Sequence, residues 1–300
     1  MNDISVIILT LNEERHIKRA IENAQKFAEK IFIVDSFSTD ATCKIAKEMN
    51  AVVYQHKWEN HSQQFQWAID NLPVKTEWVF RLDADEYLSD NLIEEIKTII
   101  RKNDGNINGY TASRQYIFLG RHIKHGIIPM RPLRLFRYGH AHIENKNMDE
   151  HIVLDDGEVG NLKGCFYDAS LMTLSEWTAK HNGYSTREAL DLLASKYAIG
   201  TVENKATNMA GRHTAHVRKM KHLYMRMPLF FRAFLLFCYR YFIRLGFLDG
   251  KEGFMWHFLQ GFWYRTLADA KVYEIEKKFN FDRDEISKYI RNKLTIKKVN

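Results

Sequence analysis

Two aspartates, Asp83 and Asp85, close an apolar run that starts at Trp78, and they form the strongest candidate for chemistry in this sequence of 300 residues. In a β-strand, alternate side chains share a face, so we expect both carboxylates to point the same way. Oxygen ligands with open positions suit Mg²⁺ or Mn²⁺, which complete their coordination with water and substrate phosphate. The pair therefore predicts a metal site for a phosphate-bearing substrate. The alternative is a solvated loop, residues 83–90, that caps the following helix.

Polar residues also end two earlier predicted strands. An apolar run over residues 4–11 contains Thr10 near its end and is followed by Asn12. A second run, residues 31–34, is followed by Asp35, which could accept a hydrogen bond from a nucleobase imide or a ribose hydroxyl. Each residue alone has an ordinary explanation in a turn or a helix cap. Because parallel strands bring their carboxyl ends to one edge, however, we expect all three beside the aspartate pair.

The first hundred residues alternate between strand-like and helix-like patterns. Residues 13–27 carry apolar side chains at helical spacing. Further helices are expected over 41–49 and 60–71, and further strands over 51–54 and 78–82. This alternation predicts an α/β fold with a mostly parallel sheet covered by helices on both faces. The sequence has neither the Gly-x-Gly-x-x-Gly of dinucleotide folds after the first strand nor a P-loop motif.

Composition is typical of a globular protein of a reducing compartment. Hydrophobic residues make up 45% of the sequence, which suffices for a large core. The three cysteines are scattered and lack metal-ligand spacing, which argues against a disulfide framework and against a zinc site. The first apolar run is preceded by an acid rather than by basic residues, unlike a signal peptide. We therefore expect a cytoplasmic protein.

Three short motifs occur in order over roughly the first ninety residues. They are Val-Ile-Ile-Leu-Thr-Leu-Asn-Glu at residues 6–13, Val-Asp-Ser-Phe-Ser-Thr-Asp at residues 34–40 and Leu-Asp-Ala-Asp-Glu at residues 82–86. In this order and spacing they resemble the nucleotide-sugar-binding half of family 2 glycosyltransferases with the GT-A fold, which is Rossmann-like. The resemblance implies an enzyme that binds a nucleoside diphosphate sugar together with Mg²⁺ or Mn²⁺.

The resemblance also implies roles for individual residues. Asp83 and Asp85 would bracket the metal and the donor sugar, with Asp85 as the metal ligand. Many relatives carry a basic residue and an asparagine in the helix before this motif, where this chain has glutamines. We expect Gln64 to contact the donor there. The residues implied to bind the nucleoside are Thr10, Asn12, Glu13 and Asp35.

A second carboxylate cluster, Asp149 and Glu150, precedes His151. Sugar transfer with inversion needs a base on the face opposite the departing diphosphate, where it takes the proton of the acceptor hydroxyl. The resemblance implies an acid pair at this place, so one of the two carboxylates is expected to be that base. Neighbouring strand residues point to opposite faces, and the sequence does not decide between them. His151 is expected to orient the base or to contact the metal or the acceptor.

Further basic residues are candidates for contacts with the acceptor or with a phosphate. Arg134 lies in an alternating run, residues 131–137, that predicts a strand. A helix is expected over residues 174–193, and its segment 177–189 resembles bacterial lipopolysaccharide and surface-polysaccharide sugar transferases. The candidates on this helix are Lys180, His181 and Arg187. Ordinary solvent-exposed charges are the alternative for all of these residues.

Residues 205–244 carry nine basic and no acidic side chains, which indicates an anionic partner. Residues 228–248 are aromatic and aliphatic but interrupted by arginine, so they do not predict a transmembrane helix. At about 3.6 residues per turn the arginines share one face, which predicts a helix in the plane of an anionic membrane, followed by a second aromatic helix over 254–273. The residues expected at the membrane are Arg232, Arg240, Arg244, Phe234, Trp256 and Trp263. Core-packing helices are the alternative, and without a recognisable motif nucleic acid is not expected as a partner.

Together these patterns predict an inverting, metal-dependent, hexosyltransferase-type enzyme, peripheral on the inner face of a bacterial cytoplasmic membrane. It would move a sugar from a nucleoside diphosphate donor, with UDP favoured, to a lipid-linked saccharide in lipopolysaccharide, O-antigen or capsule assembly. The expected domains are a catalytic domain over residues 1–200, with a donor half (1–102) and an acceptor half (103–200), and a basic aromatic helical region over 201–300. The alternatives are a catalytically silent nucleotide-sugar-binding membrane scaffold and a sugar nucleotidyltransferase, although the latter's glycine-rich, lysine-bearing loop is missing after the first strand.

Overall fold

The computed structural model describes residues 3–102, 105–144, 151–199 and 227–299, with side chains through residue 293. The chain forms two compact units. The first comprises Met1–Ile123 and Ile128–Leu171, and the second comprises Lys124–Ile127 and Met172–Asn300. The helix α5 (Leu174–Lys196), which we assigned to the acceptor half, packs in the second unit. A functional boundary at residue 200 stays a prediction.

Within the described residues, the first unit holds a nine-stranded sheet in the order β3-β2-β1-β4-β8-β6-β11-β5, with β7 paired to β6. Strands β3, β2, β1 and β4 are parallel, whereas β8 runs antiparallel to both β4 and β6. The predicted α/β fold is therefore confirmed. The strands are β1 (Ile4–Thr10), β2 (Lys30–Asp35), β3 (Val52–Gln55), β4 (Trp78–Asp83), β5 (Glu86–Leu88), β6 (Ile107–Phe118), β7 (Arg121–Ile123), β8 (Leu133–Arg137) and β11 (Glu158–Asp168).

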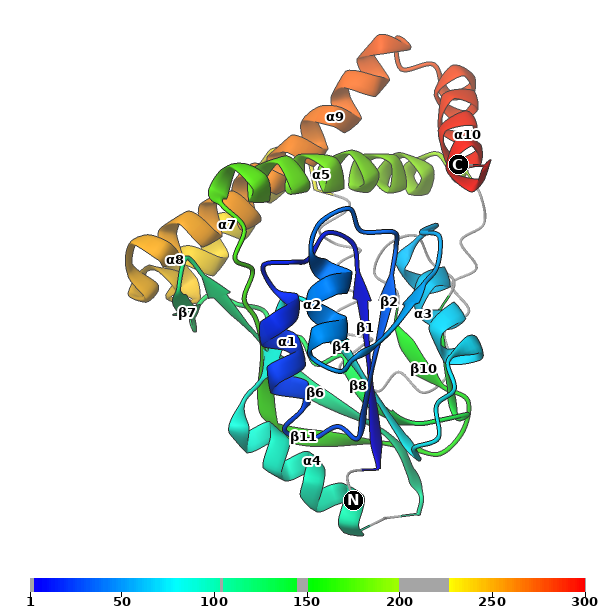
Figure 1. Cartoon of the computed structure of the whole chain (residues 1–300). Helices are drawn as coiled ribbons and strands as arrows, with labels where there is room; N and C mark the ends of the chain where they lie inside the picture. Colours follow the sequence, from blue (N-terminus) through cyan, green and yellow to red (C-terminus); the bar gives the residue numbers. More distant parts are fainter. Residues whose placement is uncertain (1–2, 103–104, 145–150, 200–226, 300) are drawn as a thin grey trace. The chain divides into compact units, whose positions relative to one another are not determined.

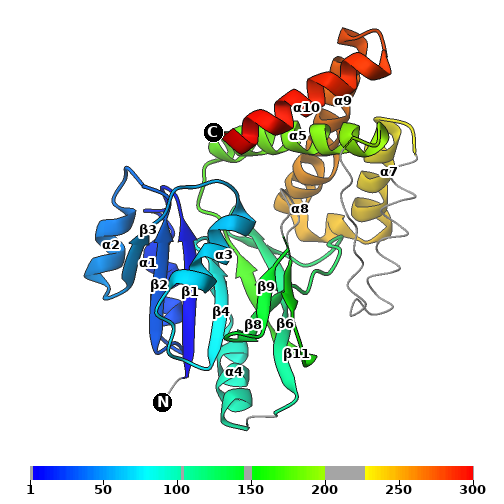
Figure 2. The same cartoon turned by 90° about the vertical axis from the view of Figure 1, so that its right-hand side faces the viewer.

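Helices cover both faces of this sheet (Figures 1 and 2). Alternate residues of β1 lie in different layers, because Val6 and Ile8 pack with α1, α2 and α4, while Ile7 packs with α3 and a small second sheet. Burial on both sides explains why β1 reads as a continuous apolar run. The elements are α1 (Ile17–Ala24), α2 (Thr42–Glu48), α3 (His61–Asn71) and α4 (Asp90–Lys102), with β9 (Ala141–Ile143) paired to β10 (Ile152–Leu154).

The second unit is helical. Helix α5 begins with a capping box, in which the side chains of Thr173 and Glu176 each accept a hydrogen bond from the backbone N–H of the other residue. This helix packs on α9 around Leu193 and Val272. In the described part of the chain, no helix combines the length and the hydropathy needed to cross a bilayer. The elements after α5 are α7 (Phe231–Cys238), the π-helix η1 (Tyr239–Ile243), the 3₁₀-helix η2 (Gly246–Asp249), α8 (Gly250–Trp256), the π-helix η3 (His257–Trp263), α9 (Tyr264–Lys278) and α10 (Arg283–Val299).

The short segment Lys124–Ile127 is held inside the second unit by Asp249. This buried carboxylate accepts the backbone N–H groups of Lys124 and His125 at 2.9 and 2.8 Å, and it contacts Nδ1 of His125 at 2.8 Å. Gly126 follows with a φ of +68°, and a Cβ there would meet the ring of His257 at 2.5 Å. Glycine is therefore required at this position for both its backbone conformation and its size.

The prediction that Arg232 and Arg240 lie on an exposed basic face is wrong. Arg232 is only 3% exposed and pairs with Asp269, its Nε lying 3.0 Å from Oδ1. Arg240 is 7% exposed, and its Nε donates to the carbonyl of Gly126 at 3.1 Å. Both guanidinium groups turn inward because their acceptors, the Asp269 carboxylate and the Gly126 carbonyl, lie on other elements. The π-helix Tyr239–Ile243, with its wider turn, also changes the projection of the residues that follow Cys238.

The other residues expected at a membrane differ in exposure. Arg244 is exposed, and Phe234 is 50% exposed. Trp256 is buried and lies 6.5 Å from Trp177, measured between ring centroids, so the alternative of core packing holds for this residue. Trp263 is half-buried. Of these four residues, Arg244 and Phe234 are therefore the ones at the surface.

His257 makes the stability of the second unit depend on pH. Its Nε2 lies 3.2 Å from the carbonyl oxygen of His125, whereas its buried Nδ1 has no partner among the described residues. Burial and the nearby charge of Arg240 lower the pKa of His257 to about 4, so the folded protein holds the ring neutral. In the unfolded chain the ordinary pKa is about 6.5. Its contribution to stability is therefore complete above about pH 6.5 and is lost as the pH falls towards 4.

We expect wild-type protein to lose on the order of 1–2 kcal/mol of unfolding free energy from this group between pH 7 and pH 5. Urea unfolding at both pH values measures the loss. In a His257→Gln variant, which keeps a donor towards the His125 carbonyl but does not titrate, this part of the pH dependence should disappear. Equal pH dependence of the two proteins would contradict the neutral, buried state of His257.

Candidate active site

The carboxyl ends of β1, β2 and β4 meet at one edge of the sheet, as the sequence predicts. Thr10 is the register partner of Asp35, and Leu9 is the partner of Asp83. The Oγ1 of Thr10 donates to Oδ1 of Asp35 at 2.9 Å. Parallel pairing of these strands thus brings together polar residues that are more than seventy positions apart in the chain.

Asp35 is fully buried and organises the loop that follows β2. It accepts hydrogen bonds from Thr10, from the hydroxyl and N–H of Ser38, and from the side-chain amide of Gln55 at 3.3 Å. Burial alone would raise the pKa of Asp35, but the hydrogen bonds from Ser38 and Thr10 outweigh it and hold the pKa below its usual range. The carboxylate is therefore charged. Its contact with a nucleobase or ribose stays a prediction, and such a contact would have to share an oxygen with these donors.

Asn12 and Glu13 connect the loops after β1 and β2. Asn12 has a left-handed φ of +56°, its N–H donates to the hydroxyl of Ser38 at 2.8 Å, and its side-chain oxygen accepts the N–H of Thr39 at 2.9 Å. Asparagine tolerates this backbone conformation better than most residues. The N–H of Glu13 donates to the hydroxyl of Thr42 at 2.8 Å, and its carboxylate contacts Nδ1 of His16 at 2.6 Å. Both residues therefore stabilise the conformation of the loops at this edge of the sheet.

Gln64 does not face a ligand site. It is fully buried in α3, where its amide nitrogen donates to the hydroxyl of Ser36 and to the carbonyl of His56, each at 3.1 Å. Its amide oxygen lies 2.7 Å from Nδ1 of His56, whose ring stacks on Trp67 with centroids 4.3 Å apart. This geometry contradicts the direct donor contact expected for Gln64, because both ends of its amide are used to hold His56 beside the end of β3.

Asp83 ends β4 in strongly cationic surroundings. Its Oδ2 lies 3.3 Å from a terminal nitrogen of Arg134, and its Oδ1 lies 3.5 Å from Nε of Arg81. Burial alone would raise the pKa of Asp83, but the charges of Arg134 and Arg81 outweigh it and keep the pKa well below its usual range. The Asp83 carboxylate is therefore negatively charged at neutral pH.

Asp85 lies in the turn between β4 and β5. Its side chain is half-buried, and its carbonyl oxygen accepts hydrogen bonds from Arg19 and from the N–H of Ala169, both at 3.0 Å. Arg19 also bonds the carbonyl of Ala169 at 2.6 Å. The backbone that carries the Asp85 carboxylate is therefore fixed from two other parts of the first unit, independently of that carboxylate.

Sequence reasoning missed a buried charged network behind these aspartates. Glu86 accepts a hydrogen bond from Arg134 at 2.7 Å and the N–H of Asp83 at 3.1 Å, while Arg114 pairs with Asp168 at 2.5 Å and lies 3.6 Å from Glu86. Burial raises the pKa of Glu86 despite the opposing charge of Arg134. The available signal was a charged residue between apolar residues of a strand, such as Arg134 in β8. Because the network joins β5, β6, β8 and β11, it fixes the Asp83 carboxylate from several strands.

The acceptor residues expected from sequence are distributed over both units. Arg134 is buried and directed towards Glu86 and Asp83, as the network shows, and not towards solvent. His151 is exposed, with Nδ1 3.3 Å from Glu144. Asp149 and Glu150, the candidate bases, lie outside the described residues.

Three further candidates lie on α5 and make their described contacts within the second unit. The ring of His181 stacks on Trp177, with centroids 3.5 Å apart, and Lys180 and Arg187 lie over the ring of Tyr184 at 5.9 and 5.1 Å. Their proposed contacts with acceptor or phosphate stay predictions.

The donor set at the end of β4 fits a divalent cation only in part. Across the described residues, no group of three or more His, Cys, Asp or Glu side chains is placed to hold a metal. Asp83 and Asp85 supply carboxylate oxygens, and Mg²⁺ is commonly held by one or two carboxylates together with substrate phosphates. These residues therefore suit a cation that arrives with a diphosphate, rather than a permanently resident structural ion.

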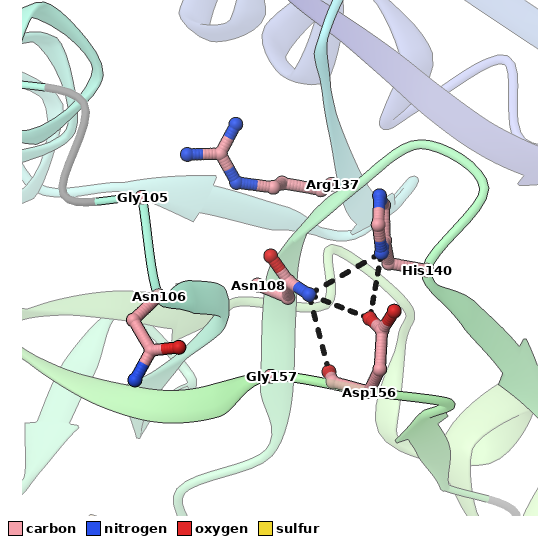
Figure 3. A pocket seen from close by; sticks show the side chains of 7 residues that line it. All are labelled: Gly105, Asn106, Asn108, Arg137, His140, Asp156 and Gly157. Carbon is pink, nitrogen blue, oxygen red and sulfur yellow. Dashed lines mark hydrogen bonds and ion pairs between the residues drawn. The ribbon is translucent and has the colours of Figure 1, made fainter.

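A separate hollow of about 530 Å³ lies at the opposite edge of the same sheet (Figure 3). Its wall includes Asn108, Arg137, His140 and Asp156, and the Asn108 amide and the His140 ring both contact Oδ1 of Asp156 at 2.6 Å. Arg137 is the register partner of Trp78, the first residue of β4, whereas Asp83 is the last. The hollow is thus distinct from the candidate active site.

Comparison with known proteins identifies similar sequences. The family described as Glycosyl transferase family 2 matches residues 5–154. The chain is 30% identical over 203 residues to an uncharacterized glycosyltransferase of Rickettsia typhi, covering 64% of this chain and 69% of that protein. It is 28% identical over 192 residues to a lipopolysaccharide core biosynthesis glycosyltransferase of Rhizobium meliloti, covering 62% of this chain and 70% of the relative. An uncharacterized glycosyltransferase of Rickettsia bellii is 28% identical over 297 residues, covering 92% and 88%.

Among solved structures, glucosyl-3-phosphoglycerate synthase of Mycobacterium tuberculosis, in complex with Mn²⁺, uridine diphosphate and glucosyl-3-phosphoglycerate, is 19% identical with a TM-score of 0.31. The match covers 38% of this chain and 43% of the synthase, less than half of its length.

Proposed function

The chain belongs to glycosyl transferase family 2, and from that premise we propose that it moves a sugar from a nucleoside diphosphate donor to a saccharide acceptor with inversion. The observation that carries this proposal is that β4 ends at Asp83, at the same sheet edge as Thr10 and Asp35, with Asp85 in the turn that follows. The polar groups in the loops at this edge can form hydrogen bonds with a nucleoside. The two carboxylates can bind a cation that in turn binds the diphosphate.

In this mechanism the chain's own residues orient the donor. The loops tied together by Asn12 and Asp35 would hold the nucleoside, and Asp85, together with Asp83, would hold Mg²⁺ or Mn²⁺. A bound divalent cation would neutralise charge on the departing diphosphate. Arg134 and Glu86 keep the Asp83 carboxylate charged and in place. Asp149 or Glu150 takes the proton from the acceptor hydroxyl as the new glycosidic bond forms.

We further propose that the acceptor is a lipid-linked saccharide of lipopolysaccharide core, O-antigen or capsule assembly, used at the inner face of the cytoplasmic membrane. Support comes from the similarity to the Rhizobium meliloti protein and from the exposed aromatic side chains of the second unit, such as Phe234. Aromatic surface of this kind suits the boundary between lipid headgroups and acyl chains.

The donor class can be tested by titrating the full-length protein calorimetrically with UDP, GDP and dTDP, each with and without Mn²⁺. We expect one nucleotide, UDP in the first place, to bind more tightly when Mn²⁺ is present. Each nucleotide without metal is the matched control. No binding of any of the three under either condition would contradict a nucleoside diphosphate donor at this sheet edge.

A further inference from the structure

The second unit carries a continuous exposed aromatic surface, which we call the aromatic face. It consists of Phe234, Phe242, Phe247, Phe254 and Phe258, each at least 38% exposed. The half-buried ring of Phe237 lies within 6.5 Å of the rings of Phe242, Phe254 and Phe258, measured between centroids. The face therefore spans α7, η1, η2, α8 and η3, which converge in space (Figure 2).

The π-helix η1 gives the aromatic face its most exposed point. This helix ends at Ile243, whose side chain is 72% exposed, next to Phe242 at 55%. The turn that follows passes through Leu245 in a left-handed conformation, with a φ of +59° and the side chain 45% exposed. A bulky apolar residue in this conformation is strained. Folding alone gives no reason to present such side chains to water.

The aromatic face stands on a rigid base. Arg240, directly before Tyr241 in η1, is buried and bonds the carbonyl of Gly126, while Asp249 at the end of η2 holds the backbone of the same segment. The backbone that carries the aromatic face is therefore held by internal polar contacts, so binding would need little rearrangement of that backbone.

Charge at the border of the aromatic face selects the partner. Arg244 and Lys251 are exposed, whereas Asp249 is buried and Glu252 is partly buried. A second copy of the chain would bring two cationic borders together across a two-fold axis, which disfavours self-association. An anionic lipid surface matches both the aromatic side chains and the exposed cations.

We propose that the aromatic face inserts into the headgroup boundary of an anionic bilayer, and that apolar burial rather than the arginines supplies most of the attachment. This inference rests on the proposed function in one respect: the proposed lipid-linked acceptor lies in the same membrane. It also replaces the expected arginine-led attachment, because Arg232 and Arg240 are internal.

The test is sedimentation of the full-length protein with vesicles in which about a quarter of the phosphatidylcholine is replaced by phosphatidylglycerol. We expect a Phe242→Ser, Ile243→Ser variant to bind at least about tenfold more weakly than wild type. Phe281→Ser is the matched control, since Phe281 is also 55% exposed in the second unit but lies outside the aromatic face. This control should bind as wild type does, and wild-type binding should largely survive high salt.

Several outcomes would overturn the proposal: no vesicle binding by wild type, unchanged binding by the double variant, or loss of binding in high salt. A dimer in sedimentation velocity that the double variant abolishes would reassign the aromatic face to self-association. The same variants are titrated with UDP and Mn²⁺. If the double variant binds the nucleotide but no longer binds vesicles, the inference is supported. If the wild-type protein binds vesicles but not the nucleotide, only the proposed function is rejected.

Discussion

An Asp85→Asn variant is expected to bind UDP in the presence of Mn²⁺ at least about a hundredfold more weakly than wild type and to lose sugar transfer by a similar or larger factor. Asparagine keeps the size of the side chain but removes the charge that a cation needs. The fold should survive, because the contacts of Arg19 and Ala169 are made with the backbone carbonyl of Asp85. Calorimetric titration measures the nucleotide affinity, and thermal unfolding checks the fold.

Asp90→Asn is the matched control for this experiment. Asp90 begins α4 a few residues later in the chain, and its side chain is 86% exposed and pairs with Lys26. Its removal changes the net charge equally but leaves the sheet edge intact, so nucleotide affinity should stay within about twofold of wild type. An Asp85→Asn variant with wild-type, Mn²⁺-dependent affinity would contradict the metal role of Asp85.

Replacing Arg232 by methionine is expected to cost about 3–5 kcal/mol of unfolding free energy, because it leaves the charge of Asp269 buried without a partner. The carboxylate is only 2% exposed, and apart from Arg232 its described bond is to the N–H of Phe230 at 2.7 Å. Urea unfolding measures the loss. The exposed Arg244, changed to methionine, is the control and should stay within about 0.5 kcal/mol of wild type.

A double variant separates this loss from poor packing of methionine. With Asp269→Leu added to Arg232→Met, no charge remains to be compensated, and most of the stability should return. If the single and double variants are equally unstable, the buried charge is not the cause. If Arg232→Met is as stable as wild type, the internal position of Arg232 is contradicted and an exposed basic face becomes tenable again.

The sheet and its edge could be predicted because their signals are local. β1 and β4 read as apolar runs that end in polar residues, and parallel pairing then brings Thr10, Asp35 and Asp83 together without further information. The sequence is less informative about pairing between distant side chains. Glu86 bonds Arg134 from 48 positions away and Arg114 bonds Asp168 from 54, and no periodicity in either segment specifies those pairs.

The errors have physical causes of the same kind. Gln64 was expected at a ligand because its helix precedes the metal motif, but the structure uses its amide to hold His56 and Ser36. The helical pattern of residues 232–244 does not reveal that Asp269 and the Gly126 carbonyl hold Arg232 and Arg240 inside the second unit. Whether Asp149 or Glu150 is the base stays a prediction.

The position of Lys124–Ile127 has a consequence for biosynthesis. His125 leaves the ribosome 124 residues before Asp249, the residue that holds it in the second unit. At roughly 5–20 residues per second, this segment waits about 6–25 seconds for its partner during translation. The strands before and after this segment can pair as soon as they are synthesised. The second unit, in contrast, can complete its contacts with the segment only after Asp249 has been synthesised. A fragment that stops before residue 249 would leave this segment permanently without its carboxylate.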